Sequence, residues 1–212
     1  MTISIVVVGL GSYGAGLAKG FSAYGYDVVG VDMKADRVRA ASGTLSKAVQ
    51  GNGASPALWK DLPVKQVDIG VVAIGGDVAS NLQAAFLLRK EGVKLVIAKS
   101  ESALHTELLK AIGINHVIEP DKESTQRLLH TLGADVEDYL EVTRDFGIAR
   151  ITVHDKLKGT TVEHLFDKYK VTVLILTHGD RVLLEPPDKE ELRLGDRLVI
   201  AGKDESLRSV PG

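Results

Sequence analysis

The chain has 212 residues, 44% hydrophobic and 25% charged, a balance typical of globular proteins with a sizeable core. Its formal net charge of −2, with Lys and Arg scattered among Asp and Glu, argues against nucleic acid or an anionic membrane surface as partners. The absence of cysteine excludes disulfides, thiolate nucleophiles and cysteine-based zinc sites, and fits a reducing cytoplasm.

The opening "MTISIVVVG" has no basic stretch, and its apolar run is much shorter than a membrane span of about 20 residues. We therefore expect neither a signal peptide nor direct membrane insertion. Any contact with a membrane is expected to occur through another protein.

From the N-terminus to about Pro120, short β-branched runs alternate with longer helical patterns, which is typical of βα units and a parallel sheet. Strands are expected at Ile3–Val8, Asp27–Val31, Ser46–Gln50, Val67–Ile74, Lys94–Ala98 and His116–Ile118. Helices are expected between them at Tyr13–Tyr24, Ala35–Ala41, Pro56–Leu62, Val78–Glu91 and Glu101–Ile112. With right-handed crossovers, these elements predict an α/β fold with a Rossmann-like, doubly wound parallel sheet.

After Glu119 the pattern changes. "DKESTQRLLHTLG" predicts a connecting helix, and "ADVEDYLEVTRDFG" then becomes strand-like. From Ala149 onward the pattern indicates short strands, a helix at "TVEHLFDKY" and a hairpin turn at His178-Gly179-Asp180. We expect one domain over residues 1–133 and, over residues 134–212, a linker and a small α+β domain. At about 75 residues, this second domain is small for an independent fold and is expected to pack against a copy of itself.

The first expected strand ends in a glycine-rich turn, "GLGSYG". Gly9 permits a tight turn, Gly11 lets a pyrophosphate approach the backbone, and Gly14 allows the helix to pack closely on the strand. Asp32 ends the second strand about 20 residues further on, where a carboxylate accepts hydrogen bonds from ribose hydroxyls. Because an acid repels a 2′-phosphate, the pattern favours an adenosine or NAD-type ribose over NADP. The alternative is a glycine turn and a surface Asp in a fold without a ligand.

Two further loops follow expected strands at the same edge of the sheet. "QGNGAS" offers Asn52 to an adenine edge, and "VVAIGGD" leaves bare backbone at Gly75 and Gly76 for a base or a ribose. Each loop is equally well explained as a simple turn. Both fall at the carboxyl ends of parallel strands, where open α/β sheets bind ligands.

Charged residues follow the fifth and sixth expected strands. Lys99 is placed to neutralise a phosphate, and Glu119 and Asp121 are candidates for holding Mg²⁺, which prefers oxygen ligands. The alternative for all three is solvated surface charge.

Catalytic patterns are missing from the sequence. It contains no GxSxG elbow, no HExxH, no GxxxxGK[ST] loop and no Tyr-x-x-x-Lys pair, and its six histidines show no metal-ligand spacing. The region after Ala134 is also too small for a typical substrate domain. We therefore expect a regulatory nucleotide-binding protein and no enzyme, with a small NAD-dependent oxidoreductase as the alternative. A redox-sensing repressor would need a DNA-reading helix pair and a basic face, and neither is visible.

A family resemblance covers nearly the whole chain. "IVVVGLGSYGAGLAKGF", "GNGAS", "VDIGVVAIGGD" and "VIAKSESALHTELLKAIGINHVIEP" resemble the N-terminal RCK (regulator of K⁺ conductance) domain of the TrkA/KtrA group. "GTTVEHLFDKYKVTVLILTHGDRVLLEPP" and "LGDRLVIAG" resemble the companion C-terminal RCK domain, also called TrkA-C. The two domains in this order are more specific than the glycine motif, which many dehydrogenases share.

This resemblance implies a cytoplasmic gating subunit of a K⁺ uptake system. Such proteins form dimers that assemble into an octameric ring and bind ATP, ADP or NAD(H) in the first domain. They act on a membrane K⁺ transporter subunit of the TrkH or KtrB type, which places them at the inner face of the membrane. The implied mechanism is a population shift, in which nucleotides bias the ring between conformations.

The resemblance also implies a set of ligand-binding residues. The glycine turn takes the pyrophosphate, Asp32 the ribose, Asn52 the base and Lys99 the phosphate side, and Asp121 falls where relatives offer an acid to a cation near the γ-phosphate. The implied nucleotide site consists of Gly9, Gly11, Ser12, Tyr13, Gly14, Asp32, Met33, Asn52, Gly53, Ala73, Ile74, Gly75 and Lys99.

Two departures from the family pattern concern ligand choice. Relatives often carry a basic residue between the second and third glycines, whereas this chain has Ser12 and Tyr13. Charge-assisted phosphate contacts are roughly twice as strong as neutral ones. The sequence therefore leaves the choice among ATP, ADP and NAD open. Some relatives bind cyclic di-AMP in the C-terminal domain, but the segment around Phe166 and Asp167 lacks the expected arginine, which argues against that ligand.

Overall fold

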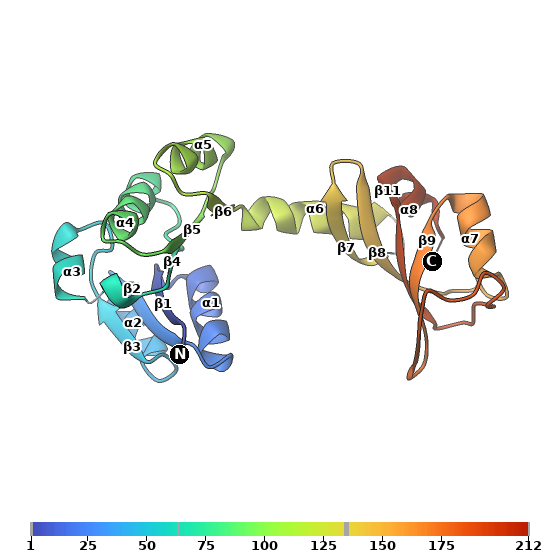
Figure 1. Cartoon of the computed structure of the whole chain (residues 1–212), viewed down its shortest axis with the longest axis horizontal. Coiled ribbons are helices and arrows are strands. Elements are labelled where there is room, and N and C mark those ends of the chain that lie inside the picture. The colour runs from blue at the N-terminus through green and yellow to red at the C-terminus, as the bar shows by residue number, and fades with distance from the viewer. Residues whose placement is uncertain (1, 63, 134–135, 212) are drawn as a thin grey trace. The chain divides into compact units, whose positions relative to one another are not determined.

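The computed structural model describes residues 2–62, 64–133 and 136–211, with the backbone alone described for residues 65, 126, 127 and 129–133. The chain divides into two compact units, Met1–Asp121 and Lys122–Gly212 (Figure 1). The helix α6 (Pro120–Gly133) contains this division. The domain boundary expected at Ala134 lies outside the described residues, and it stays a prediction.

The first unit is built on a six-stranded parallel sheet with strand order β3-β2-β1-β4-β5-β6. This order is that of a doubly wound Rossmann-like sheet and confirms the expected fold. The strands are β1 (Ser4–Val8), β2 (Asp27–Asp32), β3 (Lys47–Gln50), β4 (Ile69–Val72), β5 (Leu95–Lys99) and β6 (His116–Ile118). The helices are α1 (Ser12–Ala23), α2 (Ala35–Ala41), α3 (Pro56–Asp61), α4 (Val78–Lys90) and α5 (Ala103–Ala111), with a 3₁₀ turn at Val64–Gln66.

The central strand β1 is apolar along its length because helices cover both faces of the sheet. Val6 and Val8 belong to an apolar cluster with Trp59 of α3 and residues of α4 and α5. Ile5 and Val7 belong to a second cluster with residues of α1, on the opposite face. Because all six strands are parallel, their carboxyl ends lie at one edge of this packed sheet.

The strand expected at Val67–Ile74 is shorter in the structure, where β4 ends at Val72. Ala73 still donates its N–H to the carbonyl of Val8 at 2.7 Å, and the chain then leaves the sheet through Gly75 and Gly76. Gly76 has a positive φ of 76°, which only glycine adopts readily. The chain after β4 therefore forms a loop at the carboxyl edge of the sheet.

The second unit contains a five-stranded antiparallel sheet with strand order β10-β9-β11-β8-β7. Its elements are β7 (Val136–Thr143), β8 (Phe146–Thr152), α7 (Val162–Tyr169), β9 (Thr172–His178), β10 (Arg181–Leu184), β11 (Arg197–Lys203) and α8 (Asp204–Ser209) (Figure 1). The expected hairpin joins β9 to β10, with Gly179 at φ 57°. This unit confirms the expected small α+β domain. Among the described residues, no helix is both long and apolar enough to cross a membrane.

Candidate nucleotide-binding site

The glycine turn between β1 and α1 has the geometry that its spacing predicts. Gly9 has a φ of 94°, and a Cβ atom there would lie 2.9 Å from the carbonyl carbon of Ala73. A Cβ atom at Gly14 would collide with the carbonyl oxygen of Gly9, so α1 can approach the turn only with glycine there. Gly11 caps α1 in an extended conformation, and the N-terminus of a helix is a favourable place for an anion.

A cavity of about 400 Å³ opens at the carboxyl edge of the parallel sheet. All of the expected nucleotide-site residues except Gly14 line it, and Gly14 lies directly behind the turn. The structure thus brings together the loops that follow β1, β2, β3, β4 and β5. The residues lining the cavity that were not expected are Val8, Val31, Lys34, Arg37, Gly51, Asp77 and Ser80.

Asp32 connects the end of β2 to the glycine turn. Its Oδ2 accepts hydrogen bonds from the N–H of Leu10 at 2.6 Å and from Nη1 of Arg37 at 3.3 Å, and its Oδ1 accepts from the N–H of Lys34 at 2.8 Å. The side chain is only 6% exposed. A carboxylate accepts about four hydrogen bonds, so these contacts leave one acceptor position on Oδ1 for a ribose hydroxyl.

The loop after β3 is fixed by its own hydrogen bonds. Asn52 accepts from the N–H of Ala54 at 2.9 Å through Oδ1, and Trp59 donates its indole N–H to the carbonyl of Gly53 at 2.9 Å. The amide oxygen of Asn52 is therefore engaged in an Asx turn while the residue lines the cavity. Met33, also in the lining, has an exposed side chain that offers apolar surface beside this loop.

Lys99 forms the side of the cavity that follows β5, and Glu101 lies beside it, outside the lining. Nζ of Lys99 lies 5.9 Å from the ring centroid of Tyr13 and 3.8 Å from Oε1 of Glu101. That same Oε1 accepts a hydrogen bond from the N–H of Gly76 at 2.9 Å. The Lys99 side chain is 15% exposed, so its charge is partly shielded from solvent and acts strongly on the cavity.

Buried polar residues of α4 and α5 form hydrogen bonds with the loops that follow β4 and β5. Asn81 of α4 donates to the carbonyl oxygens of Ile74 at 2.8 Å and Lys99 at 3.2 Å. His105 of α5 accepts the N–H of Glu101 at 3.4 Å through Nδ1. Burial lowers the pKa of His105, so the ring is neutral at pH 7 and adds no charge beneath the cavity.

Sequence reasoning missed Arg37, Asp77 and Glu101. Arg37 lies on α2, five residues after Asp32. This short spacing from the expected ribose-binding acid is the local signal that could have suggested it. Asp77 caps α4 through hydrogen bonds from Ser80, and these bonds lower the pKa of its carboxyl group. Glu101 reaches the loop after β4 only through the fold, and no local pattern identifies it.

Asp121 is absent from the lining of this cavity. In the part of the chain that the structure describes, no group of three or more His, Asp or Glu side chains could hold a metal ion. The cation site expected at Asp121 stays a prediction.

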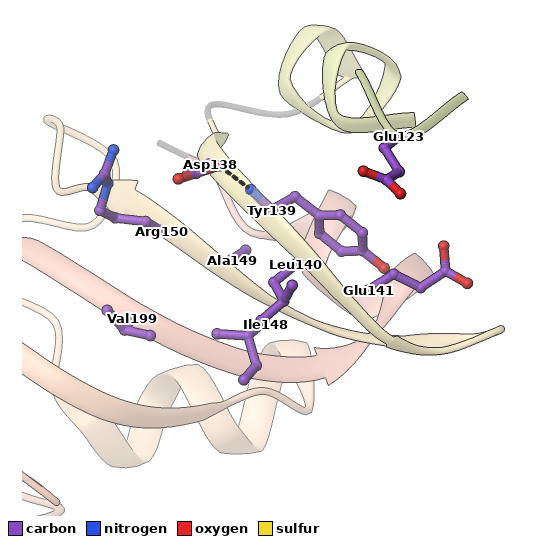
Figure 2. A pocket seen from close by; sticks show the side chains of 9 residues that line it. All are labelled: Glu123, Asp138, Tyr139, Leu140, Glu141, Ile148, Ala149, Arg150 and Val199. Atoms are coloured by element: carbon purple, nitrogen blue, oxygen red, sulfur yellow. Dashed lines mark hydrogen bonds between the residues drawn. The ribbon is translucent and has the colours of Figure 1, made fainter. Parts of the chain in front are cut away.

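A second cavity, of about 660 Å³, lies in the second unit (Figure 2). Its lining includes three acids, Glu123, Asp138 and Glu141, against one base, Arg150, which makes it a poor site for phosphate groups. The hydroxyl of Tyr139 donates to Asp204 at 2.6 Å, and burial together with this bond raises the pKa of Tyr139. The charge balance of the two cavities favours the first one as a nucleotide site.

The family follows from two matches to domain models. The TrkA-N domain model matches residues 5–120, more than half of the chain. The chain belongs to the TrkA-N family. The TrkA-C domain model matches residues 148–210, so the second unit carries a TrkA-C domain. The resemblance found in the sequence is thereby confirmed.

Curated relatives are similar over almost their whole length. The Ktr system potassium uptake protein C of Bacillus subtilis is 27% identical over 205 residues, covering 95% of this chain and 93% of that protein. The Ktr system potassium uptake protein A of Vibrio alginolyticus is 28% identical over 204 residues, covering 95% and 93%.

Solved structures share the fold. The GsuK RCK domain has a TM-score of 0.67 at 17% identity, covering 98% of this chain and 46% of that chain. The GsuK channel bound to NAD has a TM-score of 0.64 at 17% identity, covering 98% and 38%. This chain therefore spans less than half the length of these solved chains, and the likeness establishes the RCK fold.

Proposed function

We propose that this protein is a nucleotide-sensing gating subunit that regulates a membrane K⁺ transporter subunit. The observation that carries the proposal is the cavity of about 400 Å³, which gathers the glycine turn, Asp32 and Lys99 at the carboxyl edge of the sheet. The similarity to Ktr potassium uptake proteins along 95% of the chain supports the transport role. The RCK fold shared with a channel bound to NAD supports a nucleotide as the regulatory ligand.

In the proposed complex, ATP, ADP or NAD(H) places its diphosphate over Gly11 and the N-terminus of α1. Arg37 and Lys99 supply the positive charge that Ser12 and Tyr13 lack, and Asp32 accepts a hydrogen bond from the ribose. The nucleotide then acts by binding one conformation of the assembly more tightly than another. A ligand with equal affinity for both conformations would shift nothing.

We propose further that the protein works at the cytoplasmic face of the membrane, where its dimers assemble into an octameric ring. Exposed apolar side chains on two neighbouring helices support self-association, because such groups mark interaction surfaces. They are Phe86 on α4 and Leu104 and Leu108 on α5, which are 50%, 66% and 41% exposed. In this proposal, Asp121 binds a cation near the phosphates. Cyclic di-AMP is not among the proposed ligands.

The alternative, a small NAD-dependent oxidoreductase, receives less support. The two curated relatives above are named as potassium uptake proteins, and this favours a gating subunit. An oxidoreductase would also need an acid or base beside a nicotinamide, and the sequence contains no recognised pair for this task.

The test is ligand-induced stabilisation of the purified chain by ATP, ADP, NAD, NADH and cyclic di-AMP, followed by scattering and K⁺ flux. A ligand at 100 times its Kd stabilises the native state by about 2.7 kcal/mol. We expect the adenine nucleotides to stabilise the TrkA-N unit and to change the scattering profile to different extents. No stabilisation by any nucleotide, or identical profiles and flux with all of them, would overturn the proposal.

A further inference from the structure

Charged side chains lie on both sides of the glycine turn, in the nucleotide cavity or next to it. In the sheet order β2-β1-β4-β5, Asp32 and Arg37 lie on the β2 side of the turn, and Lys99 and Glu101 lie on the β4–β5 side. Each side therefore pairs a carboxylate with a cation. The pattern along the cavity runs from acid through two cations to acid.

The cations lie close to the turn itself. Nη1 of Arg37 is 3.8 Å from the position that a Cβ atom would take on Gly11, where the pyrophosphate approaches the backbone. Nζ of Lys99 lies over the ring of Tyr13, the second residue of α1. Two singly charged phosphates over the turn therefore meet one cation from each side.

The cavity carries little excess of positive charge. Its lining holds Lys34, Arg37 and Lys99 against Asp32 and Asp77, and Glu101, outside the lining, offsets the remaining positive charge through its ion pair with Lys99. A terminal phosphate carries a charge of about −1.5 to −2 at pH 7, whereas each phosphate of a dinucleotide carries only one. A triphosphate thus brings more negative charge than these side chains neutralise.

Glu101 lies beside the cavity, outside its lining, next to the loop that follows β4. Its Oε1 lies 2.9 Å from the position that a Cβ atom would take on Gly75, a residue in the cavity lining. The N–H of Gly76 and the Lys99 ammonium hold this oxygen in place. A carboxylate accepts hydrogen bonds from ribose hydroxyls but repels phosphate oxygens, which are acceptors themselves.

We infer that Glu101 selects a dinucleotide of the NAD(H) type, with a ribose on each side of its pyrophosphate, over a nucleoside triphosphate. This inference rests on the proposed function, since it concerns the same cavity. Asp32 receives the adenosine ribose, Arg37 and Lys99 flank the pyrophosphate, and Glu101 receives the second ribose.

The test is isothermal titration of the full chain with NADH and with ATP, at fixed ionic strength and with EDTA to remove divalent cations. The wild type is expected to bind NADH more tightly than ATP. In Glu101→Gln, the ratio of the ATP Kd to the NADH Kd is expected to fall about tenfold, because the repelling charge is lost. NADH affinity changes little, since the amide oxygen still accepts from a hydroxyl.

Glu107→Gln is the matched control, because Glu107 is an exposed acid on α5 and its replacement changes the net charge equally, whereas Glu101 contacts Gly76 and Lys99 beside the cavity. The ratio is expected to stay at the wild-type value in this variant. Tighter binding of ATP than of NADH by the wild type, or an unchanged ratio in Glu101→Gln, would overturn the inference while the nucleotide site stands. Failure of both ligands to bind the wild type would overturn the proposed function itself.

Discussion

Replacing Asp32 by alanine removes a side chain that serves the fold and the proposed ligand together. The substitution leaves the N–H of Leu10 without its 2.6 Å acceptor and the N–H of Lys34 without its 2.8 Å acceptor. Leu10 is 3% exposed, so water does not readily replace the lost acceptor. A buried donor left without a partner costs about 1–3 kcal/mol. The partly exposed Arg37 adds about 0.5 kcal/mol because solvent screens its ion pair.

Together these losses amount to about 3 kcal/mol in the unfolding free energy of the TrkA-N unit. For a unit of this size the melting temperature falls by roughly 10 °C. The nucleotide-induced stabilisation is expected to disappear as well, since the ribose loses its acceptor. Calorimetry with and without saturating NADH measures both effects, with Asp36→Ala as the control, because Asp36 is an exposed acid on the same helix as Arg37. If Asp32→Ala melts like Asp36→Ala and keeps the full NADH shift, the role assigned to Asp32 is wrong.

Three further predictions concern other parts of the chain. Gly14→Ala places a methyl group against the carbonyl oxygen of Gly9, so we expect the free energy of unfolding to fall by about 2 kcal/mol or more and nucleotide binding to be lost. Denaturation and titration measure the two effects, and unaltered binding would contradict the close approach of α1 to the turn. Burial lowers the pKa of His105 in the folded state, so the unfolded chain binds more protons below pH 6.5 and the stability falls as the pH drops, by at most about 1.4 kcal/mol per pH unit. Urea titrations at pH 7 and pH 5 should show a smaller fall in His105→Asn, and an equal fall would remove His105 as the cause. Tyr139→Phe loses the 2.6 Å bond to Asp204 and should lower the stability of the second unit by about 1–2 kcal/mol without changing NADH binding. A change in NADH affinity would contradict a purely structural role for Tyr139.

Much of the fold was predictable because its signals are local. The β-branched runs became β1, β2 and β5 since strands covered by helices on both faces must be apolar throughout. The glycine spacing located the turn, because a φ of 94° at Gly9 requires glycine. The helix α8 was missed because six residues carry too little periodicity, although Leu207 packs in the core of its unit.

The candidate site also has a part that local sequence signals predicted and a part that they did not. By itself the sequence determined the residues within each loop, from the glycine turn and Asp32 to Lys99, because spacing along one βα unit fixes where its strand ends. Only the tertiary structure decided which charges meet, because β4 and β5 are neighbours in the sheet and bring Glu101 to the N–H of Gly76, 25 residues away in the chain. The balance between acids and cations at and beside the cavity is therefore a property of strand order, which no local pattern encodes.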